Sequence, residues 1–450
     1  MRPDPPRSAR RKETEQRMPS LAPLAETAET VLAPTDKGVP AAAAGLTVRE
    51  FLATRPRLSQ FWTPLLALDA AALEGNAAAI QGWCSDRGLE LMPHGKTTMA
   101  PALWRLQLEA GATGLTLATP GQVRAARAFG VRSIMLANAL VAPDALAWVA
   151  AEHADPGFEF WSWADSVATV EAMERGLADA PVPSPRPIAV LVELGGAGGR
   201  TGARGLDEAL AVARRIADSP LLRLAGTAGY EGSLGHDRSA AAVAAVREYL
   251  SGMLALHARI HALADPADGP LVVTAGGSAY LDLVADVFAP AIAADAGIAA
   301  GAGTTRWVLR SGASLIHDDG FYRGISPIDG DLAAAMRGYA RVVSHPEPGL
   351  ALLDGGKRDF PYDEGLPVPL GVAERVGGDL RPLPAASVTA LNDQHAYLRS
   401  ATDAALPVAV GDVVALGLSH PCTAFDKWRW IPVVERAGSD VVVDLVRTWF

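Results

Sequence analysis

Short apolar runs and alanine-rich helical segments alternate along the first three quarters of the chain. Eight of these runs are bounded by Gly, Pro or Asp, as buried strands are, and they read LELMPH, GLTLAT, RSIMLAN, FEFWSW, IAVLVEL, LRLAGTAGY, LVVTAGG and RWVLRSG. In the segment before the first run, Leu73, Ile80 and Trp83 recur at helical spacing. Eight strands that alternate with helices predict a parallel (β/α)8 barrel of the TIM type. An open doubly wound sheet is the alternative.

The pattern changes after about residue 335. The later runs are short, rich in β-branched residues and separated by turn residues, and they read LALLDGG, SVTALNDQHAYL, DVVALG, WIPVVE and DVVVDLV. This pattern predicts a mostly antiparallel β domain. The first 42 residues are rich in Pro, Ala, Thr and charge without periodicity, which is typical of disorder, and Met18 is a second candidate start. We therefore expect a disordered leader over 1–42, a barrel over 43–335 and a C-terminal β domain over 336–450.

Composition excludes several classes of function. The 450 residues include 50 acidic and 40 basic side chains, so no excess of positive charge favours nucleic acid as a partner. Two cysteines, Cys84 and Cys422, are too few for a disulfide framework and fit a reducing compartment. No run of about 18 apolar residues predicts a membrane span. Arg10 and Arg11 are followed by polar sequence rather than by the core of a signal peptide. We expect a cytoplasmic protein.

A lysine follows the first predicted barrel strand, in the sequence PHGKT at 93–97. Barrel active sites form at the C-terminal ends of the strands, where Lys96 would lie. Partial burial there would lower the pKa of the amine and favour attack on a carbonyl carbon, although an isolated loop lysine is more often solvated.

Two glycine-containing loops follow the seventh and eighth predicted strands. TAGGSAY (274–280) supplies Gly276, Gly277 and Ser278, and RSGASL (310–315) supplies Gly312, Ala313 and Ser314. Barrels commonly bind phosphate in these two loops, because glycine lets backbone N–H groups approach the oxygens. Each loop alone is an ordinary turn sequence. Together with Lys96, they point to pyridoxal 5'-phosphate as the cofactor.

Several motifs resemble the D-serine dehydratase and D-threonine aldolase family. They are TPLLALD (63–69), PHGKT, GGSAY, LLDGG (352–356) and LSHPCTAFDKW (418–428), and the likeness runs from about residue 60 to 435. This family comprises fold-type III pyridoxal-phosphate enzymes, relatives of alanine racemase that hold a divalent metal beside the cofactor. The resemblance implies an alanine racemase-like barrel followed by a β domain.

The resemblance assigns roles around the cofactor. It implies that Lys96 forms the Schiff base and that His94 and Thr97 shape its surroundings. Arg200, in LVELGGAGGRTG, matches the arginine that faces the phenolic oxygen of the cofactor. Tyr230, in GYEG, is a candidate neighbour of the pyridine ring, and a core aromatic is the equal alternative.

A histidine and a cysteine two positions apart form the candidate metal site. His420 and Cys422 provide imidazole and thiolate, which favour zinc, although another divalent metal is possible. The pair matches the metal-ligand motif of the family, and its cysteine is typical of the dehydratases, whereas the aldolases carry aspartate. His395 is either a second acid or base or a structural histidine. The charged residues of 354–367 are expected to be mostly solvated, and Asp319 and Tyr322 lie where they could close the site.

The resemblance thus implies a lyase that uses pyridoxal phosphate and zinc and acts on D-3-hydroxy amino acids. Dehydration and deamination of a D-serine-like substrate to a 2-oxo acid and ammonia is the first expectation. Aldol cleavage of the D-threonine aldolase type, to glycine and an aldehyde, is the alternative. A racemase or a non-catalytic pyridoxal-phosphate-binding protein is a further possibility. The resemblance also implies a homodimer in which each β domain lies at the barrel mouth of the partner.

Overall fold

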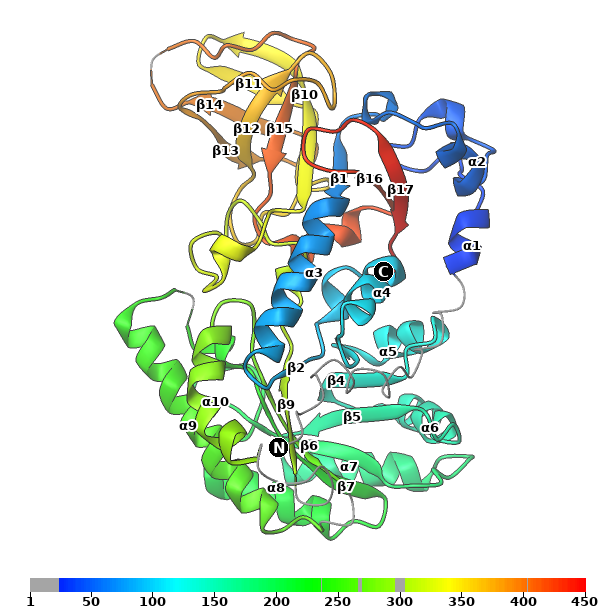
Figure 1. Ribbon diagram of the computed structural model, residues 1–450, viewed down its shortest axis with the longest axis vertical. Helices are drawn as coiled ribbons and strands as arrows, with labels where there is room; N and C mark the ends of the chain where they lie inside the picture. Colours follow the sequence, from blue (N-terminus) through cyan, green and yellow to red (C-terminus); the bar gives the residue numbers. More distant parts are fainter. Residues whose placement is uncertain (1–23, 236, 266–268, 296–303, 403) are drawn as a thin grey trace, which may run out of the picture.

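The computed structural model describes residues 24–235, 237–265, 269–295, 304–402 and 404–450 (Figure 1). Two sheets organise them. An eight-stranded parallel sheet forms the lower half of the molecule in Figure 1, and a nine-stranded sheet forms the upper half. The candidate site lies where the loops of the two sheets meet. No helix in the described ranges combines the length and the apolar character that crossing a bilayer requires.

The eight-stranded sheet is a closed barrel. Its order is β2-β9-β8-β7-β6-β5-β4-β3, and all neighbouring strands are parallel. Past the ends of β2 and β3, the N–H of Thr116 donates to the carbonyl of Pro93 at 3.0 Å, and Thr116 bridges His94. This confirms the predicted (β/α)8 barrel over the doubly wound alternative. The strands are β2 (Glu90–Leu91), β3 (Leu115–Leu117), β4 (Ser133–Ala139), β5 (Glu159–Ala164), β6 (Ile188–Leu194), β7 (Leu222–Gly229), β8 (Leu271–Ala275) and β9 (Thr305–Leu309).

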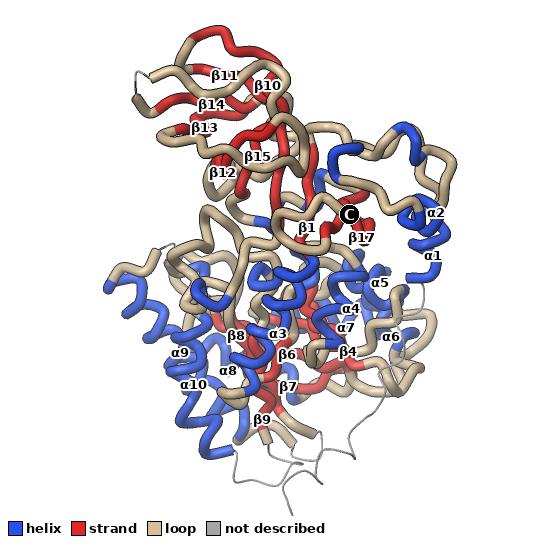
Figure 2. Tube along the Cα trace, turned by 45° about the horizontal axis from the view of Figure 1, so that its top comes forward, coloured by secondary structure: helices blue, strands red, loops and turns tan. Residues whose placement is uncertain are grey.

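Helices surround the barrel strands (Figure 2). Their starts follow ordinary capping chemistry, since Thr119, Ser166 and Ser239 each accept a hydrogen bond from the backbone N–H three residues later. Each helix buries one face, as α3 does with Leu73 and Ile80. The helices are α3 (Ala70–Ser85), α4 (Pro101–Glu109), α5 (Pro120–Ala128), α6 (Pro143–Glu152), α7 (Val167–Ala178), α8 (Leu206–Ala217), α9 (Ala240–His261) and α10 (Leu281–Asp295).

The nine-stranded sheet is antiparallel except where β1 pairs with β16. The predicted antiparallel sheet is therefore confirmed, with two strands, β10 and β12, that the sequence pattern did not indicate. The strands are β1 (Leu65–Asp69), β10 (Met336–Glu347), β11 (Leu350–Leu353), β12 (Val368–Ala373), β13 (Ala386–Leu391), β14 (Ala396–Ser400), β15 (Val413–Gly417), β16 (Trp430–Val434) and β17 (Val442–Arg447).

The N-terminal part of the described chain packs on this second sheet. Strand β1 lies between β10 and β16, so residues 65–69 pair outside the barrel to which we assigned them. Residues 24–42, which we placed in a disordered leader, include helix α1 (Leu24–Glu29) and the buried side chains of Leu32 and Val39. These two side chains share an apolar cluster with helix α2 (Val48–Ala53) and with β16 and β17. Residues 1–23 of the predicted leader lie outside the described residues.

Candidate active site

Lys96 lies on a 3-10 turn, Gly95–Thr97, directly after β2. The indole N–H of the fully buried Trp104 donates to the Gly95 carbonyl at 3.0 Å and holds this turn in place. A Cβ at Gly95 would lie 3.0 Å from that indole nitrogen, so the close approach favours glycine. Burial lowers the pKa of Lys96, and the nearby cations Arg200 and Arg310 lower it further against the opposing effect of Cys422. The amine is thereby shifted towards its neutral, nucleophilic form.

Two adjoining cavities of about 520 and 530 Å³ surround Lys96 at the barrel mouth. Their size is that of a cofactor or small-molecule site. The residues common to both are Lys96, Arg200, Tyr230, Gly277, Ser278, Tyr322 and His420. The cavity of about 520 Å³, called the inner cavity below, is also lined by predicted cofactor and metal residues, namely His94, Thr97, Gly276, Gly312, Ala313 and Cys422. Residues more than 300 positions apart thus meet in one space.

One of the two predicted phosphate loops is arranged differently from our expectation. The backbone N–H groups of Gly276 and Gly277 donate to the two carboxylate oxygens of Glu231, at 2.9 and 2.6 Å. Glu231 is fully buried on the 3-10 turn after β7. In this structure a carboxylate therefore occupies the two amides of the loop at which we expected the phosphate, and the role of Gly276 and Gly277 at the cofactor stays a prediction.

The second loop retains the features of an anion cradle. Gly312 precedes the 3-10 turn Ala313–Leu315 and provides no side-chain cap for its N–H groups. A Cβ on Gly312 would lie 2.6 Å from the carbonyl oxygen of His94, so only glycine fits. The hydroxyl of Ser278 lies 2.7 Å from that of Ser311, which also hydrogen-bonds the hydroxyl of Ser314. Ser314 itself is buried and lines neither cavity.

Arg310 is a buried cation that the sequence reasoning missed. It is 3% exposed, and its guanidinium donates to the Thr274 hydroxyl at 2.7 Å and to the Gly229 carbonyl at 2.6 Å. It lies over the ring of Trp163 and lines the inner cavity. Burial, together with Lys96, Arg310 and Arg200, holds the pKa of His94 well below its usual value. His94 is therefore neutral.

Arg200 and Tyr230 lie together at the boundary of the two cavities. The guanidinium carbon of Arg200 is 5.4 Å from the ring centre of Tyr230. Within the described ranges Arg200 forms no ion pair with a carboxylate, so its charge is available to an anionic ligand. Burial and the charge of Glu231 raise the pKa of Tyr230 to about 12, so its phenol stays protonated.

The predicted metal pair lies against the lysine turn. The sulfur of Cys422 is 3.4 Å from the hydroxyl oxygen of Thr97, and Nδ1 of His420 is 2.7 Å from a carboxylate oxygen of Asp363. Burial lowers the pKa of His420, but its hydrogen bond to Cys422 and the charges of Cys422 and Asp363 outweigh this and raise it to about 9. The imidazole thus lies beside two negatively charged groups, which favour positive charge at this position, either on the ring or on a bound metal ion.

These donors fit zinc, for which imidazole and thiolate are common ligands. The Nδ1–H group of His420 donates to the carboxylate of Asp363, so Nε2 is the ring nitrogen that would hold a metal, as in metal sites where an outer carboxylate orients the histidine. No cluster of three or more His, Cys, Asp or Glu side chains in ligating positions occurs among the described residues.

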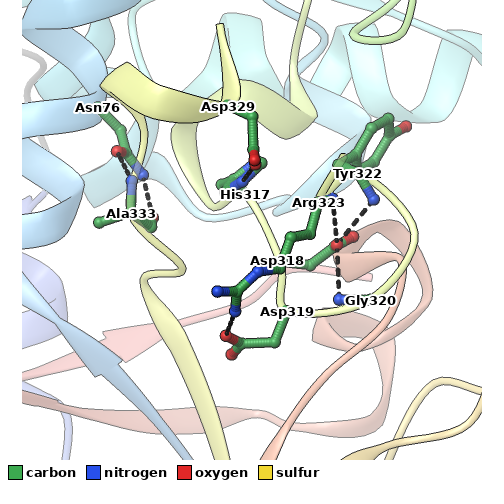
Figure 3. Close-up of polar contacts among 9 residues, drawn as sticks. All are labelled: Asn76, His317, Asp318, Asp319, Gly320, Tyr322, Arg323, Asp329 and Ala333. Carbon is green, nitrogen blue, oxygen red and sulfur yellow. Dashed lines mark hydrogen bonds and ion pairs between the residues drawn. The ribbon is translucent and has the colours of Figure 1, made fainter. Parts of the chain in front are cut away.

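His395 is not brought to this site within one chain. It lies in the exposed turn between β13 and β14 and lines neither cavity. His317, in contrast, is a buried loop residue that bonds Asp329 at 2.7 Å, and the Asn76 amide pairs with the backbone of Ala333 (Figure 3). These contacts fix the segment that carries Tyr322 beside the cavities.

Comparison with known proteins gives two matching family models. Residues 68–281 match the model "Alanine racemase, N-terminal domain", and residues 335–434 match the model "Putative serine dehydratase domain".

Two characterised relatives are similar over most of their length. The D-threonine aldolase of Arthrobacter sp. is 27% identical over 379 residues, which cover 84% of this chain and 90% of the relative. The 3-hydroxy-D-aspartate aldolase of Paracoccus denitrificans (strain Pd 1222) is 24% identical over 322 residues, which cover 70% and 76%.

Solved structures share the fold. The D-threonine aldolase from Filomicrobium marinum superposes with a TM-score of 0.70 at 22% identity, over 87% of this chain and 95% of that one. The D-threo-3-hydroxyaspartate dehydratase from Delftia sp. HT23 superposes with a TM-score of 0.66 at 21% identity, over 87% and 99%. The two-sheet arrangement is therefore shared along nearly the whole length of these proteins.

Proposed function

The chain is related to the D-serine dehydratase and D-threonine aldolase family of fold-type III pyridoxal-phosphate enzymes, and we propose that it is a lyase that acts on D-3-hydroxy amino acids with pyridoxal phosphate and zinc. Dehydration and deamination of a D-serine-like substrate is the first reaction we propose. Aldol cleavage is the second, because a D-threonine aldolase is similar over most of the chain. The proposal includes a homodimer.

One observation carries the proposal. The turn that bears Lys96 contacts the turn that bears His420 and Cys422, through the 3.4 Å approach of the Thr97 hydroxyl to the cysteine sulfur. Both turns line the same inner cavity. A lysine of lowered pKa and an imidazole–thiolate pair are the groups that covalent cofactor attachment and zinc binding require.

The residues around the cavity divide into two groups in this proposal. Lys96 would hold the cofactor, with Ser278, Gly312 and Ala313 at its phosphate and with Arg200 and Tyr230 beside its ring. When bound, pyridoxal phosphate would accept the electrons left at Cα as the proton departs. Once the substrate amine had taken its place on the cofactor, the freed and partly buried Lys96 amine would take up that proton, because its lowered pKa favours the neutral form.

His420 and Cys422 would hold the metal on the same side of the cavity. Zinc would act as a Lewis acid on the β-hydroxyl of the substrate and stabilise the negative charge that develops there. Asp363 would accept the Nδ1 proton of His420 and orient the ring, and Nε2 would release its proton on binding the metal. Cys422 favours elimination over cleavage, because cysteine at this position resembles the dehydratases.

Product analysis tests the proposal. The protein loaded with zinc and pyridoxal phosphate is incubated with D-serine, D-threonine, D-3-hydroxyaspartate and their L-forms, and the products are quantified, with Lys96→Ala as the control. A 2-oxo acid and ammonia from the D-forms support the dehydratase, whereas glycine and an aldehyde support the alternative. No turnover of any D-form by the loaded protein would reject the lyase.

A further inference from the structure

A buried carboxylate joins the loop after the last barrel strand, β9, to the loop that carries the candidate metal ligands His420 and Cys422. Asp318 is 4% exposed and lies in the segment after β9, between His317 and Tyr322. One of its oxygens, Oδ1, accepts hydrogen bonds from the N–H groups of Gly320 at 3.1 Å, Tyr322 at 2.8 Å and Arg323 at 3.4 Å (Figure 3). This oxygen therefore fixes the turn from which Tyr322 reaches both cavities.

The other oxygen of Asp318 reaches a residue 102 positions further along the chain. Oδ2 accepts the backbone N–H of His420 at 2.9 Å. Two neighbouring bonds join the same loops, since Asp319 N–H donates to the Leu418 carbonyl and Phe321 N–H donates to the Ser419 hydroxyl, both at 3.1 Å. The barrel loop and the metal-ligand loop thus form one hydrogen-bonded unit.

His420 adopts a backbone conformation that needs such support. Its φ of 59° lies in the left-handed region, which few residues other than glycine adopt. Asp318 binds its N–H and Asp363 binds its Nδ1, so the backbone and the ring are each held by a carboxylate. The ring centres of His420 and Tyr322 lie 6.2 Å apart. The direction of Nε2 therefore depends on the anchored backbone as well as on the ring.

We propose that Asp318 is a positioning residue that sets the affinity of the His420–Cys422 pair for zinc. The inference rests on the zinc site of the proposed function. Zinc accepts nitrogen and sulfur ligands within narrow distances, about 2.0–2.1 Å and 2.3 Å, so a small rotation of the His420 backbone moves Nε2 out of range. Loss of an outer-shell partner typically weakens metal binding by about 10–100-fold.

The matched control is Asp329, in the same segment. Its carboxylate bonds Nε2 of His317 at 2.7 Å, and the hydrogen bonds and ion pairs of the described residues include none between Asp329 and His420. A general loosening of the segment would affect Asp318→Asn and Asp329→Asn alike. Positioning of the metal ligand affects only Asp318→Asn, which keeps the size of the side chain but removes its charge.

The experiment is a competition for zinc between a chromophoric chelator and the pyridoxal-phosphate-loaded protein, with the cofactor absorbance recorded in parallel. We expect Asp318→Asn to bind zinc about 10–100-fold more weakly, with cofactor absorbance unchanged, and Asp329→Asn to bind it as the parent does. Asp318→Glu, which keeps the charge at a different reach, should bind zinc with intermediate affinity. It replaces Asp318→Asn in the test if the asparagine variant does not fold.

The outcomes separate this inference from the proposed function. If the parent binds zinc and the Asp318 variants bind it equally well, the positioning role is rejected and the lyase proposal stands. Equal weakening in the Asp318 and Asp329 variants also rejects it, because the segment then acts only through stability. A parent that binds no zinc rejects both the metal part of the proposed function and this inference.

Discussion

Replacing Glu231 by glutamine tests the arrangement of the barrel mouth most sharply. The carboxylate of Glu231 is fully buried, accepts the N–H groups of Gly276 and Gly277, and has the largest influence of the negatively charged groups on the pKa of the buried Arg310. Glutamine has the same shape but only one acceptor oxygen. Its NH2 group would face one of the two glycine N–H groups, and the charge opposite Arg310 would be lost.

The size of the effect follows from these contacts. A hydrogen bond to a charged group contributes about 1.5–3 kcal/mol, and a buried donor left without an acceptor costs about 1–3 kcal/mol. The two energies cannot simply be added, because the lost hydrogen bond and the unpaired donor are the same contact. We therefore expect Glu231→Gln to lower the free energy of unfolding by about 2–4 kcal/mol.

The assay is urea unfolding of the cofactor-free protein near neutral pH, followed by tryptophan fluorescence and circular dichroism. The matched control is Glu193→Gln at the end of β6. Glu193 is also buried, but it accepts one hydroxyl, that of Thr201 at 2.7 Å, which a glutamine oxygen can equally accept. We expect less than about 1 kcal/mol from this control. Equal unfolding free energies for the Glu231 variant and the parent would refute the reasoning.

Three further predictions concern the cofactor site and pH. Lys96→Ala should abolish the absorbance of lysine-bound pyridoxal phosphate, and an unchanged band would place the attachment elsewhere. Gly312→Ala should weaken pyridoxal-phosphate binding measured by titration, because its Cβ meets the His94 carbonyl at 2.6 Å, whereas Gly330→Ala, which has open space, should not. Burial lowers the pKa of His153 from 6.5 to about 4, so the folded protein holds this ring neutral while the unfolded chain protonates it. The free energy of unfolding is therefore unaffected by this group above pH 6.5 and decreases as the pH falls towards 4. Between these pH values the parent should lose about 1–3 kcal/mol more unfolding free energy than His153→Gln, and equal losses would contradict this.

The barrel could be predicted because its strands are largely buried. Strand β6, for example, is apolar throughout except for Glu193, and an uninterrupted apolar run between turn residues indicates such a strand. Strand β1 reads the same way, but a strand pattern does not specify its partner. Its pairing with β10 and β16 depends on contacts with residues 268 to 365 positions away.

The polar partners of the site could not be read from the sequence. Glu231 follows Tyr230 in a short polar turn and accepts from amides 45 and 46 positions later. Asp363 belongs to a loop that we expected to be mostly solvated, but it bonds His420 57 positions later. The identity of Lys96, His420 and Cys422 as candidates came from motifs, whereas the carboxylates that hold their surroundings become visible only in the folded chain. The role of His395 stays a prediction.

The central claim is that Lys96 and the His420–Cys422 pair form one site. Crystals grown with pyridoxal phosphate and zinc, with diffraction recorded at the zinc absorption edge, test it directly. The account predicts an anomalous peak about 2.3 Å from the Cys422 sulfur and about 2.0–2.1 Å from Nε2 of His420, in the cavity where the cofactor joins Lys96. A zinc peak bound elsewhere, or a Lys96 side chain without cofactor pointing away from that cavity, would contradict it.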